Sequence, residues 1–323
     1  MRIGIIGTGK HGSRYANHIV RDIEGLELTA ISRRSLEGSD QGTKWDCSWY
    51  DNWQELVVDD RVDAVIAVVP PVLNPDIARA CAEAGKPLLI EKPLAVSSHA
   101  AREIMHLFAG RNLALTVGQT LRYNQIIRGL RDYLPEIGSL YSLSANQRLE
   151  PSSLSWHEDP LQAGAGVSFH TAVHIFDAIR FITGLEIRRV MAVSRKHVSS
   201  TLEDVLAVLL EMDKDIVGTI DCSKVGHART GRFEFIGEKG QLHGDQVHNI
   251  LERIHNMKVE RLETGEPANT IFHLLQDWKA FLAGQAANPV PAEEGLAALR
   301  LCEACLTSSR TGNWVEVNET EKA

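Results

Sequence analysis

The glycine-rich segment Gly7–Gly12 carries the most specific chemical pattern in the sequence. It follows the apolar run Arg2–Ile6 and opens the helical pattern Ser13–Arg21. The first glycine permits a tight turn, the second lets the backbone approach a pyrophosphate, and the third lets a helix pack closely on a strand. The free N–H groups at the start of such a helix favour phosphate. The alternative is a glycine-rich turn that binds nothing. We expect a dinucleotide to contact all six residues of the segment, Gly7, Thr8, Gly9, Lys10, His11 and Gly12.

The end of the next predicted strand, Leu26–Ser32, indicates which dinucleotide is bound. A site for NAD usually has a carboxylate here, which accepts a hydrogen bond from the ribose 2′-hydroxyl. Glu27 lies too early in the strand, and the strand ends instead at Ser32, Arg33 and Arg34. The donor fork of a guanidinium matches a phosphate. We therefore expect these three residues to contact the cofactor and NADP to be preferred over NAD; the alternative is an exposed basic turn.

The first 120 residues alternate between short apolar runs and helical patterns. The runs are continuous in Val, Ile and Leu, which is typical of a parallel sheet covered by helices on both faces. The alternation predicts a doubly wound α/β domain. The predicted strands are Arg2–Ile6, Leu26–Ser32, Ala64–Val69, Pro87–Ile90 and Leu113–Val117, and the predicted helices are Ser13–Arg21, Trp53–Val58, Asn74–Ala84 and Ser97–Phe108.

Beyond about residue 120 the pattern changes. Phe233 and Phe235 alternate with polar residues, a period of two that the first part lacks. The segments Asp213–Asp215 and Gly237–Gly240 have the composition of hairpin turns. The predicted strands are Leu140–Leu149, Ile187–Lys196, Val205–Met212, Ile216–Cys222, Arg232–Ile236 and Lys258–Leu262.

Length and composition restrict the class of protein. A chain of 323 residues suggests two domains. The formal net charge of −8 argues against nucleic acid or an anionic membrane surface as a partner. We see no signal peptide and no apolar run long enough to span a bilayer, so we expect a cytoplasmic protein. The five scattered cysteines, including the pair Cys302 and Cys305, are expected to be reduced and to bind no metal.

Two further segments carry a resemblance to a known family. Glu91-Lys92-Pro93 follows a predicted strand, and the glycine-led segment Gly164–Asp177 carries His170 and His174. Together with Gly7–Gly12, these segments resemble the Gfo/Idh/MocA oxidoreductases, such as glucose–fructose oxidoreductase and inositol dehydrogenase. The resemblance implies a Rossmann domain over residues 1–120 that binds NAD(P). It also implies a substrate-binding and oligomerisation domain over residues 121–323, with a large open, mostly antiparallel sheet whose face pairs subunits into a homodimer or homotetramer.

The resemblance also implies the chemistry. Hydride would pass between nicotinamide and a hydroxyl or carbonyl carbon of a sugar, polyol or sugar derivative, and a proton must then move on the substrate oxygen. Lys92 and His174 are implied as the groups that move it. His170 stands where many relatives have aspartate, and it either carries a proton or shapes the pocket. The spacing of four places both histidines on one helix face, but we expect no metal there.

Other site residues follow from register with the family. Expected cofactor contacts are Val69, Pro70, Asn74, Glu91, Lys92 and Gln119, and expected substrate contacts are Lys92, Arg122, Tyr123, Trp156, His170 and His174. Trp156 packing in the core is an equal alternative. Asp177 is expected to buttress its helix or the histidine. Trp45, Trp49 and Trp53, spaced by four, suit one helix or loop beside the adenine. Two other functions stay open: an imine or other carbonyl reductase, and a non-catalytic NADP-sensing regulator.

Overall fold

The computed structural model describes residues 1–199 and 201–317, and these fall into two compact units. The first consists of Met1–Thr120 and Asn269–Leu296, and the second of Leu121–Ala268 together with the residues from Ala297 onward. The last six residues of the expected second domain, 318–323, lie outside the described residues.

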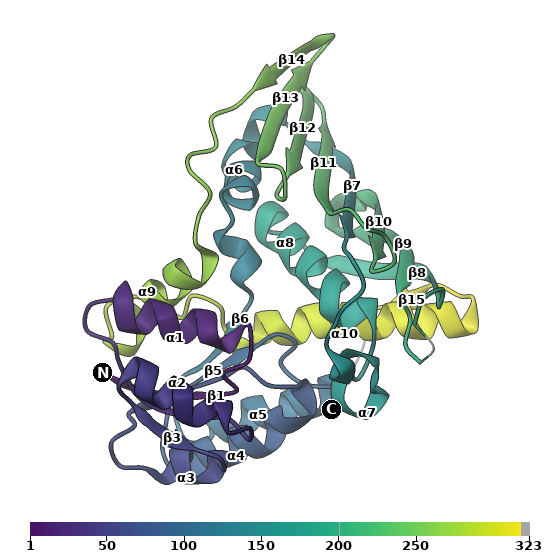
Figure 1. Ribbon diagram of the computed structural model, residues 1–323. Helices are drawn as coiled ribbons and strands as arrows, with labels where there is room; N and C mark the ends of the chain where they lie inside the picture. The colour runs from purple at the N-terminus through teal and green to yellow at the C-terminus, as the bar shows by residue number, and fades with distance from the viewer. Residues whose placement is uncertain (200, 318–323) are drawn as a thin grey trace. The chain divides into compact units, whose positions relative to one another are not determined.

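The described part of the first unit contains a sheet of six parallel strands in the order β3-β2-β1-β4-β5-β6 (Figure 1). Its central strand β4 is apolar throughout and fully buried, and the parallel order confirms the predicted doubly wound sheet. The strands are β1 (Arg2–Ile6), β2 (Glu27–Ser32), β3 (Ser48–Tyr50), β4 (Ala64–Ala67), β5 (Leu88–Glu91) and β6 (Leu115–Gly118). The helices are α1 (Gly12–Arg21), α2 (Glu37–Trp45), α3 (Trp53–Val58), η1 (Pro71–Leu73), α4 (Asn74–Glu83), α5 (Ser98–Ala109) and α9 (Thr270–Leu282).

Helix α2 and strand β3 were not predicted, and they change the interpretation of the tryptophans. Trp45 ends α2, Trp49 lies in β3 and Trp53 begins α3, so the expectation of one helix or loop is wrong. The chain turns sharply between the first two because Asp46 adopts a left-handed conformation, with φ of 53°.

The segment 269–296 returns to the first unit. Asn288 accepts a hydrogen bond from Thr116 Oγ1 at 2.9 Å and donates one to Leu115 O at 2.8 Å, both in β6. Lys279 of α9 donates to Glu24 O at 2.9 Å, just beyond α1. The expected division placed this segment in the second domain, and the structure differs there because these side chains bind to strand β6 and to the loop after α1.

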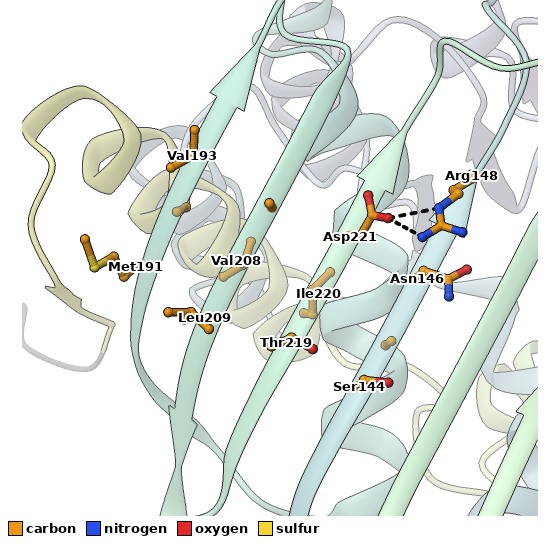
Figure 2. Close-up of a pocket in the computed structure, with 13 residues that line it drawn as sticks. Ser144, Asn146, Arg148, Met191, Val193, Val208, Leu209, Thr219, Ile220 and Asp221 are labelled. Carbon is orange, nitrogen blue, oxygen red and sulfur yellow. Dashed lines mark hydrogen bonds and ion pairs between the residues drawn. The ribbon is translucent and has the colours of Figure 1, made fainter.

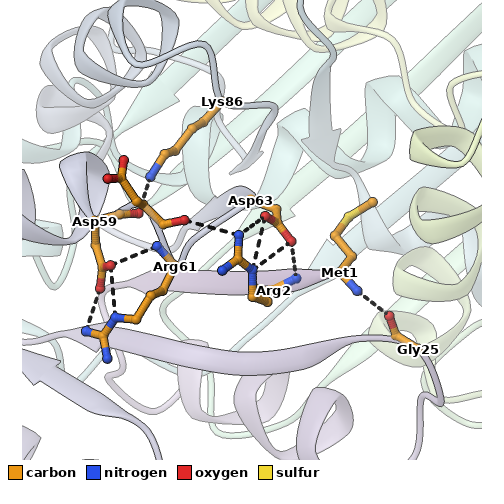
Figure 3. A network of polar contacts seen from close by, with 8 residues as sticks. Met1, Arg2, Gly25, Asp59, Arg61, Asp63 and Lys86 are labelled. Carbon is orange, nitrogen blue, oxygen red and sulfur yellow. Dashed lines mark hydrogen bonds and ion pairs between the residues drawn. The ribbon is translucent and has the colours of Figure 1, made fainter.

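A polar network lies at the amino ends of β1 and β4 (Figure 3). Arg2 forms an ion pair with Asp63 at 2.6 Å, and Arg61 forms one with Asp59 at 2.8 Å. Lys86 Nζ donates to Asp59 O at 2.7 Å. The glycine-rich turn follows the carboxyl end of β1, so this network belongs to the other edge of the sheet.

The described part of the second unit contains a sheet of nine strands in the order β14-β13-β12-β11-β7-β10-β9-β8-β15. Among the described strands of this sheet, only β7 and β10 pair in parallel, which confirms the mostly antiparallel sheet. Both predicted hairpins are present: Asp213–Asp215 joins β9 to β10, and Gly237 pairs with Gly240. The strands are β7 (Leu140–Arg148), β8 (Ile187–Arg195), β9 (Val205–Met212), β10 (Val217–Ser223), β11 (Thr230–Gly237), β12 (Gly240–Asp245), β13 (Ile250–His255), β14 (Lys258–Arg261) and β15 (Val315–Glu316).

Helices cover one face of this sheet (Figure 1). Helix α6 packs closely on β12 and β13 because a glycine lies at each contact. A Cβ at Gly129 of α6 would lie 2.7 Å from Leu251 of β13, and one at Gly244 of β12 would lie 2.8 Å from Ile126 of α6. The opposite face carries the outward side chains of the strands. The helices are η2 (Thr120–Tyr123), α6 (Gln125–Tyr133), η3 (Leu134–Ile137), η4 (Ser155–Glu158), α7 (Pro160–Ala163), η5 (Ser168–Ala172), α8 (Val173–Thr183), η6 (Asp213–Asp215) and α10 (Ala292–Thr311), which begins within the first unit. In the described residues, no helix combines the length and apolar character needed to cross a membrane.

Candidate functional site

The glycine-rich turn has the geometry that a dinucleotide needs. Gly7 has φ of 91°, and a Cβ there would lie 2.2 Å from Val68 O. A Cβ at Gly12 would lie 2.0 Å from Gly7 O, whereas the corresponding space beside Gly9 is open to 4 Å. Two glycines are therefore required by the turn, and the third leaves room for a ligand at the N-terminus of α1. A pyrophosphate fits this cradle, because the backbone can approach it without a side chain in between.

Thr8 is fixed by side chains from two other segments. Its carbonyl accepts hydrogen bonds from Ser13 Oγ at 3.0 Å, Gln41 Nε2 at 3.0 Å and Arg33 Nη1 at 2.8 Å. Its hydroxyl donates to Gln41 Oε1 at 2.6 Å, so the side chain is directed into the protein. The sequence did not reveal Gln41, because the helix that carries it was not predicted. Lys10, in the same turn, is exposed.

A carboxylate that we did not expect, Glu37 of α2, lies beside Arg33 just after the end of β2. Arg33 donates from Nε to Ser35 Oγ at 2.8 Å and from Nη1 to Thr8 O, and its Nη2 forms an ion pair with Glu37 in the first turn of α2. Each of the three guanidinium nitrogens therefore has a partner within the protein. Ser32 is buried and Arg34 is exposed. The Glu37 carboxylate occupies the guanidinium that a 2′-phosphate would use, and contacts of Ser32, Arg33 and Arg34 with the cofactor stay predictions.

Glu91 is a buried carboxylate at the end of β5, with 7% of its surface exposed. Its Oε1 lies 2.8 Å from His11 Nε2 and accepts a hydrogen bond from Tyr15 at 2.5 Å, and its Oε2 accepts one from Lys92 N at 3.0 Å. Burial acts to raise the pKa of Glu91, but the hydrogen bond and charge of His11, helped by Lys92 and Tyr15, hold it below its usual range. Both oxygens are thus engaged within the protein, and a direct contact of Glu91 with the cofactor stays a prediction.

The residues around Lys92 divide into those that brace the chain and those that suit a ligand. Asn74 is buried and donates to Pro93 O at 3.2 Å and Leu94 O at 3.1 Å, so it braces the segment after the lysine. The Lys92–Pro93 peptide is cis, and Lys92 itself is half-buried.

Gln119 is 0% exposed, and its amide has no hydrogen-bond partner among the described residues. Such an amide suits a polar group of a bound cofactor. The two remaining predicted contacts, Val69 and Pro70, are half-buried in the loop after β4.

In the second unit, the structure brings together three rings. His157 stacks on His170 with ring centroids 3.9 Å apart, and Trp156 meets the two edge-on at 4.1 and 5.5 Å. His170 lies in the π-helical turn η5, and His174 is the half-exposed residue of the otherwise buried first turn of α8. The sequence pattern did not identify His157, because a contact between residues 13 positions apart in different elements has no periodic signature.

The buried carboxylate of Glu203 binds the backbone at the start of η5. Glu203 Oε1 accepts hydrogen bonds from Gly166 N at 2.9 Å and Ser168 N at 3.1 Å. A Cβ at Gly166 would lie 1.9 Å from Glu203 O, which explains the glycine-led pattern. In the described residues, no cluster of three or more His, Cys, Asp or Glu is arranged to hold a metal ion.

Arg122 and Asp177 form a buried bidentate pair. Arg122 donates from Nε to Asp177 Oδ2 at 2.9 Å and from Nη2 to Oδ1 at 2.6 Å. Asp177 therefore binds Arg122, a partner that we did not expect, and its support of its helix or a histidine stays a prediction. Tyr123 is buried as well, with its ring under Arg128. Substrate contacts by Arg122 and Tyr123 stay predictions.

The fold and the glycine turn define an oxidoreductase with an NAD-binding Rossmann domain. The family model for oxidoreductases of this kind matches residues 1–119, and the model for the Gfo/Idh/MocA C-terminal domain matches residues 135–243. The chain belongs to the Gfo/Idh/MocA family of NAD(P)-dependent oxidoreductases, which confirms the resemblance.

Relatives match over nearly their whole length. The chain is 26% identical to inositol 2-dehydrogenase 1 of Saccharopolyspora erythraea, over 100% of this chain and 98% of the relative. It is 25% identical to inositol 2-dehydrogenase of Rubrobacter xylanophilus, over 96% of this chain and 91% of the relative. An oxidoreductase domain protein from Kribbella flavida has the same fold, with a TM-score of 0.89 at 24% identity over 98% of this chain and 99% of the other.

Proposed function

We propose that this protein is an NADP-preferring dehydrogenase that transfers hydride between nicotinamide and a CH–OH carbon of a polyol, sugar or sugar derivative. The observation that carries the proposal is the Glu91–Lys92 arrangement, in which a buried carboxylate holds the main chain of a half-buried lysine beside the dinucleotide turn. The relatives named inositol 2-dehydrogenases support a polyol or sugar as the class of substrate.

The residues of the first unit take the following parts in the reaction. The cradle at Gly9 and the N-terminus of α1 hold the pyrophosphate, and Gln119 binds a polar group of the cofactor. Arg33 and Arg34 favour a 2′-phosphate because guanidinium and phosphate form charge-assisted hydrogen bonds. The nicotinamide supplies or accepts the hydride when the cofactor is bound. Lys92 moves the proton on the substrate oxygen.

The residues of the second unit act on the substrate hydroxyl. His174 serves as acid, base or orienting donor, because it is the half-exposed polar residue of its helical turn. His170 stacks on His157 with ring centroids 3.9 Å apart, and it either carries a proton or shapes the substrate pocket together with His157.

We also propose that the open face of the nine-stranded sheet pairs two subunits in a homodimer or homotetramer. Met191 opposes Leu209 and Val193 opposes Ala207 across β8 and β9, and these side chains line a hollow of about 490 Å³ on that face (Figure 2). An exposed apolar strip of this kind is typical of an interface. Leu209→Asp should yield monomers in light scattering; unchanged oligomers would place the interface elsewhere.

A substrate panel tests the proposed activity. Purified protein is incubated with NADP⁺ or NAD⁺ and myo-inositol, levoglucosan, glucose or sorbitol at several pH values, and reduced cofactor is followed by absorbance. Reduction of the cofactor with at least one compound, slowed about 100-fold in Lys92→Ala, supports a dehydrogenase. Tight cofactor binding without any reduction of the cofactor would favour the regulatory alternative. In a second assay, oxidation of NADPH by an added imine, without reduction of NADP⁺ by any of the four compounds, would favour the imine reductase.

A further inference from the structure

The buried Glu91 carboxylate joins the dinucleotide turn to the main chain of Lys92. We propose that His11 and Tyr15 are positioning residues, which act through Glu91 to set the placement of Lys92. The inference rests on the role proposed for Lys92 in the reaction. His11 belongs to the glycine-rich turn and Tyr15 to α1, whereas Glu91 and Lys92 belong to the end of β5, about 80 positions further along the chain.

The directions of the hydrogen bonds follow from the charge of Glu91. Its pKa lies below the usual range, so the carboxylate is ionised near neutral pH and can only accept. Tyr15 must therefore donate its hydroxyl proton, and His11 must carry a proton on Nε2. Both bonds end on Oε1, at 2.8 and 2.5 Å, which leaves Oε2 for the Lys92 N–H at 3.0 Å.

The surroundings leave Glu91 little room for another arrangement. Strand β6 passes it at Gly118, where a Cβ would lie 2.9 Å from Glu91 Cδ, so the glycine lets the carboxylate fit. Tyr15 is fully buried, so it contacts other parts of the protein and not a bound cofactor. The side chain of His11 is 42% exposed, so it can respond to a cofactor bound at the turn.

Lys92 is sensitive to this arrangement because its backbone nitrogen is one of the bonded atoms. A shift of about 1 Å in a catalytic group costs about 100-fold in rate. Loss of one donor to Oε1 leaves that oxygen with a single donor, so the carboxylate that accepts from the Lys92 N–H is held less firmly. When the buried Tyr15 is replaced, we expect turnover to fall and cofactor affinity to stay unchanged.

The test compares variants that remove one donor at a time. Tyr15→Phe removes only the hydroxyl, His11→Leu removes the ring donor, and His11→Gln keeps an N–H donor of similar reach. Tyr50→Phe is the matched control, because Tyr50 donates to a carboxylate of the same unit, Asp59 at 2.7 Å, in the network at the opposite sheet edge. Turnover, KM, NADPH affinity and melting temperature are measured for each.

Tyr15→Phe and His11→Leu should lower kcat at least tenfold, Tyr15→Phe should bind NADPH within twofold of the wild type, and His11→Gln should recover most of the turnover. Tyr50→Phe should keep wild-type kcat. A kcat of Tyr15→Phe within twofold of the wild type, or His11→Gln no better than His11→Leu, would overturn the inference.

A second readout needs no substrate and separates this inference from the proposed function. The rate at which acetic anhydride labels Lys92 is measured by mass spectrometry and normalised to the exposed Lys10. Tyr15→Phe should change the Lys92 rate at least threefold, and Tyr50→Phe should not. Altered labelling in a protein that reduces no cofactor would support the positioning role and reject the dehydrogenase, whereas unchanged labelling would reject the positioning role.

Discussion

Replacing Glu37 by glutamine should widen the preference for NADPH over NADH. Glu37 forms an ion pair with Arg33, whose guanidinium also donates to Ser35 and to the carbonyl of Thr8 at 2.8 Å. The carboxylate competes with a 2′-phosphate for the same cation. It also offers an acceptor to the 2′-hydroxyl of NADH. Removing the charge of Glu37 should therefore strengthen the binding of NADPH and weaken the binding of NADH.

The size of the effect follows from the exposure of Glu37. Its side chain is 67% exposed, so the pair is screened by solvent and contributes about 0.2 to 1 kcal/mol, or roughly 1.5- to 5-fold in affinity. The proposed bond from Arg33 to a 2′-phosphate would be stronger, at about 1.5 to 3 kcal/mol for a charged partner. Arg33→Ala should therefore weaken NADPH binding roughly 10- to 150-fold.

Fluorescence titration of NADPH and NADH gives both dissociation constants for each variant. The control is Glu55→Gln, which removes a carboxylate from the first turn of α3 in the same unit. Glu37→Gln should lower the NADPH constant and raise the NADH constant, and Glu55→Gln should change neither. Equal changes for both cofactors would refute the competition, and tighter binding of NADH by the wild type would refute the NADP preference itself.

Three further outcomes are expected. Lys92→Ala should reduce turnover about 100-fold, the scale of a lost acid or base, while NADPH titration shows nearly unchanged affinity. His170→Asn should remove or shift the limb of the kcat/KM profile between pH 5 and 8; the same limb at similar rates would make His170 a spectator. Asp177→Asn should destabilise the protein by about 3 to 5 kcal/mol in urea unfolding, because it removes the negative charge from a buried bidentate ion pair; a loss below 1 kcal/mol would contradict this.

Local patterns were sufficient to predict much of the fold. The run Arg2–Ile6 and the three glycines of the following turn depend on neighbours in sequence, so they were predictable. Helix α2 was not, because its residues include Gly38 and Gly42, which disfavour a helix. The structure explains them: a Cβ at Gly38 would lie 2.1 Å from Trp49 Nε1, so the helix packs where only glycine fits.

The parts of the candidate site that escaped prediction depend on contacts between distant segments. Gln41 and Glu37 could not be assigned to the site from the sequence, because both lie on α2, which was not predicted. The bond between His11 and Glu91 joins residues 80 positions apart, and the one between Arg122 and Asp177 joins residues 55 apart. No periodicity links such pairs, so the sequence identified the residue types without their partners.

Direct transfer of deuterium tests the proposed activity most closely. The protein is incubated with NADP⁺ or NAD⁺ and carbon-deuterated myo-inositol, levoglucosan, glucose or sorbitol, and the reduced nicotinamide is analysed by mass spectrometry. We expect at least one compound to place deuterium on the nicotinamide ring, more readily with NADP⁺, and Lys92→Ala to slow the transfer about 100-fold. Absence of deuterium from the ring with every compound and both cofactors, or transfer at an undiminished rate in Lys92→Ala, would contradict hydride transfer assisted by this lysine.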